Sequence, residues 1–194
     1  MKRLLLYILI LSGVGMTACI KNDPVTYNDA LAEFDATAWN ANAAGVTYPV
    51  MTRVPIYGAA TPTSSFTLHR SSGTVKFRVN MVGPTAKSER TVGFKLFDVP
   101  FATVSFPATA TGQTPARAAA TLTTAVATPG THYTALGNSV TIPADSTWGY
   151  ITLQILDAGA TAGQARTIGI SLDSTGSVKA SPNYRQLAIA IDQR

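Results

Sequence analysis

Side chains that commonly carry catalysis are few in this chain, which has two histidines and one cysteine among 194 residues. His69 and His132 lie in separate turn-rich segments, TLHRSS and GTHYT, and neither stands at a spacing typical of zinc ligands. The nucleophile motif GxSxG and the metalloprotease motif HExxH do not occur in the sequence. We interpret both histidines as bonded to solvent or backbone, and we predict no catalytic residue, no metal site and no cofactor.

The acidic residues offer no better basis for an enzyme. A glycosidase needs two carboxylates about 5 to 9.5 Å apart in a cleft. Asp29, Glu33 and Asp35 lie close together near the start of the mature chain, but their spacing does not single out such a pair. The sequence therefore predicts a protein that is not an enzyme, with a hydrolase of unrecognised type as the most distant alternative.

The single cysteine, Cys19, closes a segment with three parts. A basic start precedes the apolar run LLLYILIL, and the small-residue stretch SGVGMTA follows and ends at Ala18. This arrangement is typical of a secretory signal peptide. A membrane-spanning helix needs about 20 apolar residues, which is more than this segment offers. We predict that residues 1–18 are cleaved, so that Cys19 becomes the first residue of the mature protein.

The tetrapeptide Met16-Thr17-Ala18-Cys19 resembles a bacterial lipobox, in which the cysteine thiol receives a diacylglycerol and the freed amine is acylated. The resemblance implies lipidation of Cys19, including palmitate, and attachment to a membrane through N-terminal acyl chains, of which stable anchoring needs more than one. Ile20 stands where enteric lipoproteins retained in the inner membrane have Asp. We therefore expect an outer-membrane lipoprotein on the cell surface or the periplasmic face.

Removal of residues 1–18 lowers the net charge from +5 to +3, because Lys2 and Arg3 leave with them. The remaining basic residues are scattered, which argues against nucleic acid as a partner. Residues 19–31 are polar and broken by Pro24, which predicts a lipidated tether. Residues 32–194 are long enough for one domain with a single core, which forms without a disulfide bond.

Aromatic residues provide one candidate site. Trp148 and Tyr150 alternate with the apolar residues of WGYITLQIL, so they share the face of a strand that points away from the core. Residues two apart on one strand face lie about 6.5 to 7 Å apart. Such a pair is suited to stacking on sugar rings or to anchoring a protein, unless a crossing loop covers it.

Basic residues provide a second candidate site. Lys76, Arg78 and Lys95 point outward from two strands that we expect to pair through the loop GPTAKSER. Paired in this way, the three side chains form a small basic patch suited to anionic glycans or lipid head groups. The alternative is an ordinary solvated strand face.

We predict that short strands position these residues, because the mature chain is rich in Thr, Ala, Val, Gly and Pro and is divided into short segments by turn residues. Alternation is clearest in GTVKFRVNMVG, RTVGFKLFD, YITLQIL, RTIGISL and RQLAIAID. The residues expected to point inward are Val75, Phe77, Val79, Met81, Val92, Phe94, Leu96, Ile151, Leu153, Ile155, Ile168, Ile170, Leu172, Leu187, Ile189 and Ile191. The low-complexity stretch from Pro107 to Gly130 suits either an edge strand or a surface loop.

The stretch ATPGTHYTALGNSVTIPADSTWGYITLQILD, residues 127–157, resembles Calx-beta domains in its G-T-x-Y turn, its short strand ending in I-P-A and its aliphatic strand ending at Asp. Residues 34–192 are similar to lipoproteins of unknown function from Bacteroidetes, many of them encoded in polysaccharide-utilisation loci. The resemblance implies an all-β fold, an immunoglobulin-like (Calx-beta-like) antiparallel β-sandwich. We do not extend the calcium site of calcium-binding Calx-beta domains to this chain, because the loop after Leu156 contains only one acidic residue, Asp157, and Ca²⁺ needs several carboxylates.

From these features we predict a non-enzymatic binding or accessory module that serves in glycan acquisition, with a glycan or a neighbouring outer-membrane protein as its partner. The alternative is a structural subunit of an outer-membrane assembly or an adhesin. A binding module requires an exposed aromatic or polar groove, whereas an assembly subunit requires a large apolar patch.

Overall fold

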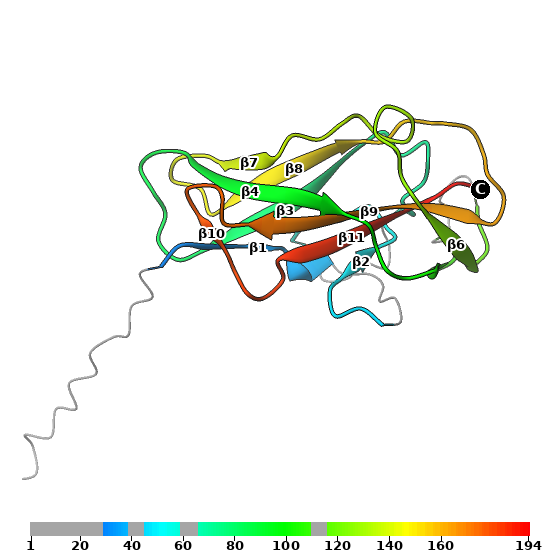
Figure 1. The fold of residues 1–194 in the computed structure, drawn as a ribbon, viewed down its shortest axis with the longest axis horizontal. Helices are drawn as coiled ribbons and strands as arrows, with labels where there is room; N and C mark the ends of the chain where they lie inside the picture. The colour runs from blue at the N-terminus through cyan, green and yellow to red at the C-terminus, as the bar shows by residue number, and fades with distance from the viewer. Residues whose placement is uncertain (1–28, 39–44, 59–65, 110–115) are drawn as a thin grey trace, which may run out of the picture.

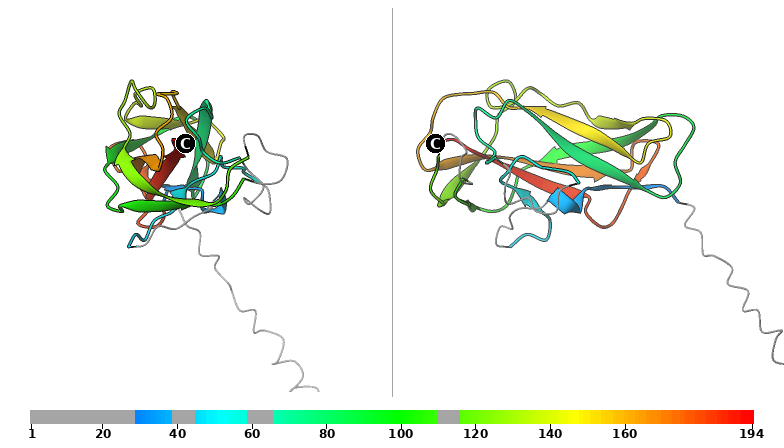
Figure 2. Two further views of the ribbon diagram at one scale, coloured as in Figure 1. Left: turned by 90° about the vertical axis from the view of Figure 1, so that its right-hand side faces the viewer. Right: turned by 180° about the vertical axis from the view of Figure 1, so that it is seen from behind.

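The computed structural model describes residues 29–38, 45–58, 66–109 and 116–194, which fold into two β-sheets packed face to face (Figures 1 and 2). The predicted signal peptide and Cys19 lie outside the described residues. Strand β1 begins at Leu31, the last residue of the predicted tether. No helix in the described ranges is long and apolar enough to cross a membrane. The predicted all-β sandwich is confirmed.

One sheet has four strands, in the order β10-β1-β3-β8. These strands are β10 (Lys179–Ala180), β1 (Leu31–Phe34), β3 (Thr74–Val82) and β8 (Trp148–Gln154). Strands β3 and β8 are the long pair and run antiparallel. A short 3-10 turn, η1 (Ala36–Ala38), follows β1.

The other sheet has seven strands and follows the order β2-β11-β9-β4-β7, with β5 and β6 joined to it beside β9. Its strands are β2 (Val50–Met51), β4 (Arg90–Phe97), β5 (Thr103–Phe106), β6 (Ala120–Val126), β7 (Ser139–Ile142), β9 (Gln164–Asp173) and β11 (Gln186–Asp192). Three pairings, β1 with β10, β2 with β11 and β6 with β9, are parallel. Both sheets are therefore mixed rather than purely antiparallel as expected.

The central core lies between the sheets and is built from the alternating residues that the sequence singled out. Along β3 the inward residues Val75, Phe77 and Val79 are almost completely buried, and Ile151 and Leu153 of the neighbouring strand β8 lie beside them on the same side of the sheet. Burial of an aliphatic or aromatic side chain of this size contributes about 1.5 to 3 kcal/mol. These contacts fix the register of both strands, because a slip by one residue would turn every core side chain to solvent.

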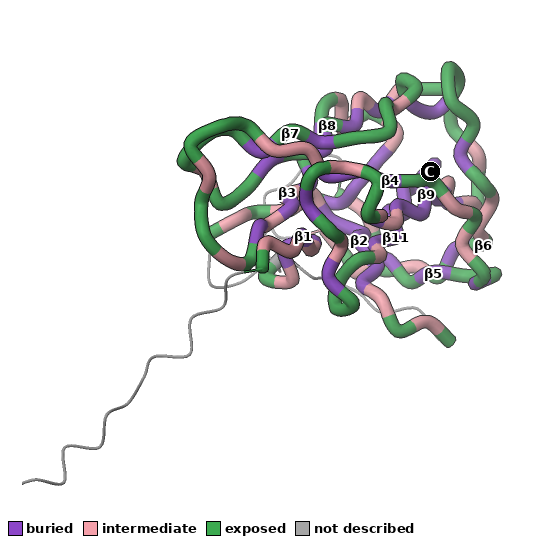
Figure 3. The backbone as a smooth tube through the Cα atoms, turned by 60° about the vertical axis from the view of Figure 1, so that its left-hand side comes forward, coloured by how far each residue is buried: buried purple, intermediate pink, exposed green. Residues whose placement is uncertain are grey.

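A second apolar cluster covers the outer face of the seven-stranded sheet. We call it the outer cluster; its buried members are Val50, Phe101, Val104, Phe106, Leu122, Ala165, Ala188 and Ala190. Strand β11 is consequently buried on both faces, with large residues toward the central core and alanines toward the outer cluster. Strands β9 and β11 are buried along most of their length, whereas many residues of the connecting loops are exposed (Figure 3).

The expected pairing of β3 with β4 is wrong. Strands β1 and β8 occupy the two edges of β3, so the chain after Val82 crosses to the other sheet, where β4 pairs with β7 and β9. Leu96, predicted to point into the core, is 42% exposed. Strand β7 borders β4 only as far as Gly93, so Leu96 lies on a stretch of β4 that pairs with β9 alone.

Candidate functional site

The candidate site is the outer face of the four-stranded sheet, which we call the open face. Alternation along β3 and β8 places one set of side chains in the core and the other set outward. The register sets Arg78 opposite Tyr150 and Asn80 opposite Trp148. Residues distant in sequence are thereby brought into one surface.

Trp148 and Tyr150 stand exposed on this face, at 45% and 39% of their surface. The alternative that a crossing loop buries the pair is therefore wrong. Gly149 between them points inward, where a Cβ atom would collide with the carbonyl oxygen of Thr141 on β7. The glycine allows β7 to approach closely while both rings remain on the outer surface.

Arg78 is held between aromatic rings on the open face. Its guanidinium carbon lies 4.6 Å from the centre of the Tyr57 ring and 5.7 Å from that of Trp148. Stacking of this kind stabilises a cation by about 0.5 to 1 kcal/mol at an exposed site. The indole of Trp148 therefore rests against an ordered group.

Asp35, which follows β1, fixes the other side of Arg78. Arg78 Nε donates to Asp35 Oδ2 at 2.5 Å, and Arg78 Nη2 pairs with the same oxygen. The other carboxylate oxygen accepts hydrogen bonds from the amide and hydroxyl of Thr37, at 2.8 and 2.6 Å. Burial raises the pKa of Asp35, but the bonds from Thr37 and Arg78 outweigh it and hold the pKa below its usual value. The pair is therefore charged at neutral pH.

Tyr57 completes the support of the two rings. Its hydroxyl accepts from the amide of Arg78 at 2.7 Å and donates to the carbonyl of Lys76 at 3.3 Å. Strand β1 ends before this point, so the tyrosine hydroxyl satisfies backbone groups that a strand would otherwise bond. Burial, the largest cause, raises the pKa of Tyr57 to about 12, so the hydroxyl stays protonated. The Tyr57 ring lies 6.1 Å from that of Tyr150.

The predicted basic patch of Lys76, Arg78 and Lys95 does not form one surface. Lys95 lies on the seven-stranded sheet and pairs with Asp173 at 3.7 Å, and Arg78 is neutralised by buried Asp35. Lys76 alone remains exposed on the open face, with its ammonium group 5.8 Å from the centre of the Tyr150 ring. The cause is the crossing of the chain between sheets after β3.

The two histidines are buried, and each has hydrogen-bond partners within the fold. His132 Nδ1 accepts from the amide of Thr128 at 2.9 Å. His69 Nε2 lies 2.8 Å from the carbonyl oxygen of Arg194 and 2.5 Å from Nη2 of Arg117. Burial is the main cause that lowers the pKa of each histidine. Asp157 pairs with Arg70, and the described ranges contain no group of three metal-ligating side chains.

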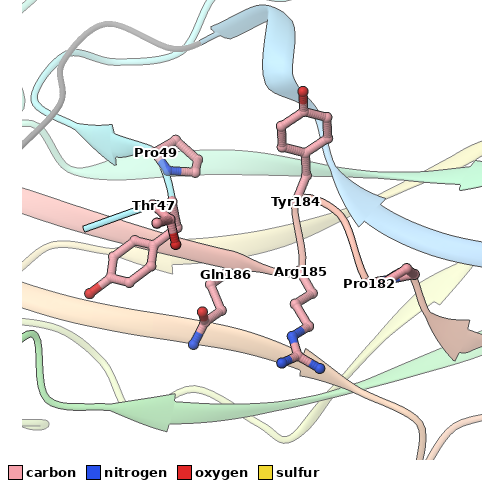
Figure 4. Close-up of a pocket in the computed structure, with 7 residues that line it drawn as sticks. Thr47, Pro49, Pro182, Tyr184, Arg185 and Gln186 are labelled. Carbon is pink, nitrogen blue, oxygen red and sulfur yellow. The ribbon is translucent and has the colours of Figure 1, made fainter. Parts of the chain in front are cut away.

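A pocket of about 200 Å³ provides a second candidate, lined by Thr47, Tyr48, Pro49, Pro182, Tyr184, Arg185 and Gln186 (Figure 4). The Tyr184 ring points away from the side chains of Arg185 and Gln186, so the polar groups do not converge. Ligand pockets for drug-sized molecules enclose about 300 to 1,000 Å³ and converge a few polar groups on one point. The open face is the better candidate.

No family model matches the chain, and no curated protein matches it. A solved structure of the Calx CBD1 domain in its apo form is similar to it, with 11% sequence identity and a TM-score of 0.48. The similarity covers 85% of this chain and 97% of that domain.

The sequence identified Trp148, Tyr150, Arg78 and Lys76, because strand alternation decides which side chains point outward. It did not identify Tyr57 as a member of the site, and it gave Asp35 no role there. Tyr57 is 21 residues from Arg78 in the chain, and Asp35 is 43 residues from it.

Proposed function

We propose that the protein is a lipid-anchored, non-enzymatic binding module whose open face recognises a saccharide. The observation that carries the proposal is the exposure of Trp148 and Tyr150 on adjacent outward positions of one strand. Sugar rings present flat C–H faces that stack on such side chains. A few aromatic residues commonly supply most of a binding energy.

The arrangement suits recognition rather than chemistry. Arg78, Asp35 and Tyr57 hold one another through hydrogen bonds and an ion pair, so they order the platform. A site ordered before its ligand arrives loses less conformational entropy on binding. We therefore assign the network a positioning role and Trp148 and Tyr150 the contact with the ligand.

A binding assay on Trp148→Ala tests the proposal. On a glycan array, the full-length protein in detergent should bind a saccharide class, and the variant should weaken that binding by about 2 kcal/mol or more. Its melting temperature should change little, because the ring is exposed. Tyr184→Ala is the matched control, since Tyr184 is also 45% exposed but lines the pocket of Figure 4.

Two results would contradict the saccharide platform. Loss of stability with unchanged binding would make Trp148 a packing residue. Loss of binding in Tyr184→Ala alone would move the site to the pocket. If no saccharide binds and Trp148→Ala disrupts a complex isolated from native membranes, the open face belongs instead to a subunit of a membrane assembly.

The anchor is tested separately at Cys19. Cys19→Ser should abolish incorporation of labelled palmitate and leave an uncleaved or mislocalised precursor, because no other cysteine is present in the chain. Equal labelling of this variant and the native protein would contradict the lipoprotein assignment. The result does not depend on the ligand of the open face.

A further inference from the structure

The open face has an aromatic half and a polar half. Trp148 and Tyr150 form the first, and the second begins at the next outward position of β8, where exposed Thr152 lies opposite Lys76. The six residue steps from Trp148 to Gln154 cover about 20 Å at the usual rise of a strand. This length is more than one sugar ring occupies, so the face fits an extended chain.

The charges of the open face are unevenly distributed. Arg78 is neutralised by Asp35, whereas no salt bridge within the described residues involves Lys76. Glu33 is a second acid near this face, opposite Asn80 at the Trp148 end. Four residue steps along β3 separate Asn80 from Lys76, about 13 Å. The polar half therefore carries an uncompensated positive charge.

Lys76 also lies where a stacked ligand would place its substituents. Its ammonium group is 5.8 Å from the centre of the Tyr150 ring. A ring stacked on Tyr150 thus brings its exocyclic group toward a lysine that makes no salt bridge with any carboxylate in the part of the chain that the structure describes. Charge complementarity at this point favours an anionic substituent on the sugar.

We propose that the ligand is an acidic saccharide, a chain of uronic acid residues that lies along β8. Successive rings stack on Trp148 and Tyr150, and a carboxylate of the chain pairs with Lys76. The inference rests on the proposed saccharide-binding function and specifies the class of sugar. Trp148 and Tyr150 supply affinity for the rings, and Lys76 selects the acid.

The experiment compares oligomers of a uronic acid with the same oligomers after methyl esterification of every carboxyl group. The two ligands share ring type and length and differ in charge. By titration calorimetry on the full-length protein in detergent, the free acid should bind about three- to five-fold tighter than the ester at low salt, as one exposed ion pair allows. The preference should shrink as salt is added.

Two variants test whether Lys76 causes the preference for the free acid over the ester. Lys76→Gln should bring the ratio of the two dissociation constants close to one. Lys179→Gln should keep the native ratio, because this exposed lysine belongs to β10, at the far edge of the same sheet. Equal loss of preference in both variants would overturn the assignment to Lys76.

The outcomes separate this inference from the proposed function. Equal binding of acid and ester, both weakened by Trp148→Ala, would overturn the acidic specificity and leave the saccharide platform. Absence of binding to either oligomer and to every neutral saccharide would overturn both. Binding to anionic lipid vesicles that depends on Trp148 and Lys76, without binding to the oligomers, would also overturn the inference.

Discussion

The outer faces of the two sheets differ in what covers them. On the seven-stranded sheet the outward residues of β11 include Ala188 and Ala190, and the outer cluster buries both completely. On the four-stranded sheet the outward residues of β8 include Trp148 and Tyr150, which stay exposed. Small residues lie where another layer packs, and large rings lie where the described chain places no layer. Packing within the fold accounts for the first pattern, and the binding function proposed above would account for the second.

The largest expected effect compares the two faces of one strand. Phe77→Ala should lower the free energy of unfolding by about 3 to 5 kcal/mol, because Phe77 is buried between the sheets. Its neighbour Lys76 points to the open face, so Lys76→Ala should change stability by less than about 0.5 kcal/mol. Urea unfolding of both variants measures the difference. The reverse ranking would mean that the register of β3 is shifted by one residue.

A smaller effect should distinguish the two outer faces. Ala190→Leu adds atoms to the filled outer cluster and should destabilise the protein by about 1 to 3 kcal/mol. Thr152→Leu places the same side chain on the open face and should stay within about 0.5 kcal/mol of the native protein. Thermal unfolding monitored by circular dichroism compares them. Equal melting temperatures would contradict the conclusion that the outer cluster covers Ala190 whereas Thr152 is exposed.

Strand alternation was sufficient to predict the sandwich and the inner residues of β3, β8, β9 and β11, because a core face imposes a period of two. It did not predict which strands pair. The connection after Val82 is compatible with a hairpin in sequence, and only the occupation of both edges of β3 by other strands excludes it. The alanines of β11 likewise indicate a second buried face only when the outer cluster is known.

In the candidate site too, local alternation within a strand could be predicted from the sequence, whereas contacts between distant segments could not. Trp148 and Tyr150 could be predicted because their position depends on local alternation within one strand. The placement of Lys95 beside Lys76 failed because it assumed a local hairpin, whereas both strands pair with partners distant in the sequence. Asp35 and Tyr57 reach Arg78 from other parts of the chain, so no local pattern links the three residues.

The smallest expected effect concerns pH and follows from where the buried histidines lie. His69 packs against Arg117 beside buried Asp192, and His132 Nδ1 accepts a backbone hydrogen bond. Burial and neighbouring arginines lower both histidine pKa values below their usual value of 6.5 in the folded state. The unfolded chain therefore binds more protons below this pH. The histidine contribution to stability is complete above pH 6.5 and is lost as the pH falls.

Measurement of the melting temperature between about pH 7.5 and about pH 5.5 tests this, since carboxylates do not titrate appreciably in that range. The native protein should lose stability toward the acidic end, and the combined His69→Gln and His132→Gln variant should lose less. Lys76→Gln is the control and should keep the native slope, because the open face has no histidine among its outward strand residues. An equal slope in the histidine variant would show that these buried groups do not couple folding to pH. Acidification should therefore remove the stability that depends on His69 and His132 staying neutral in the folded protein.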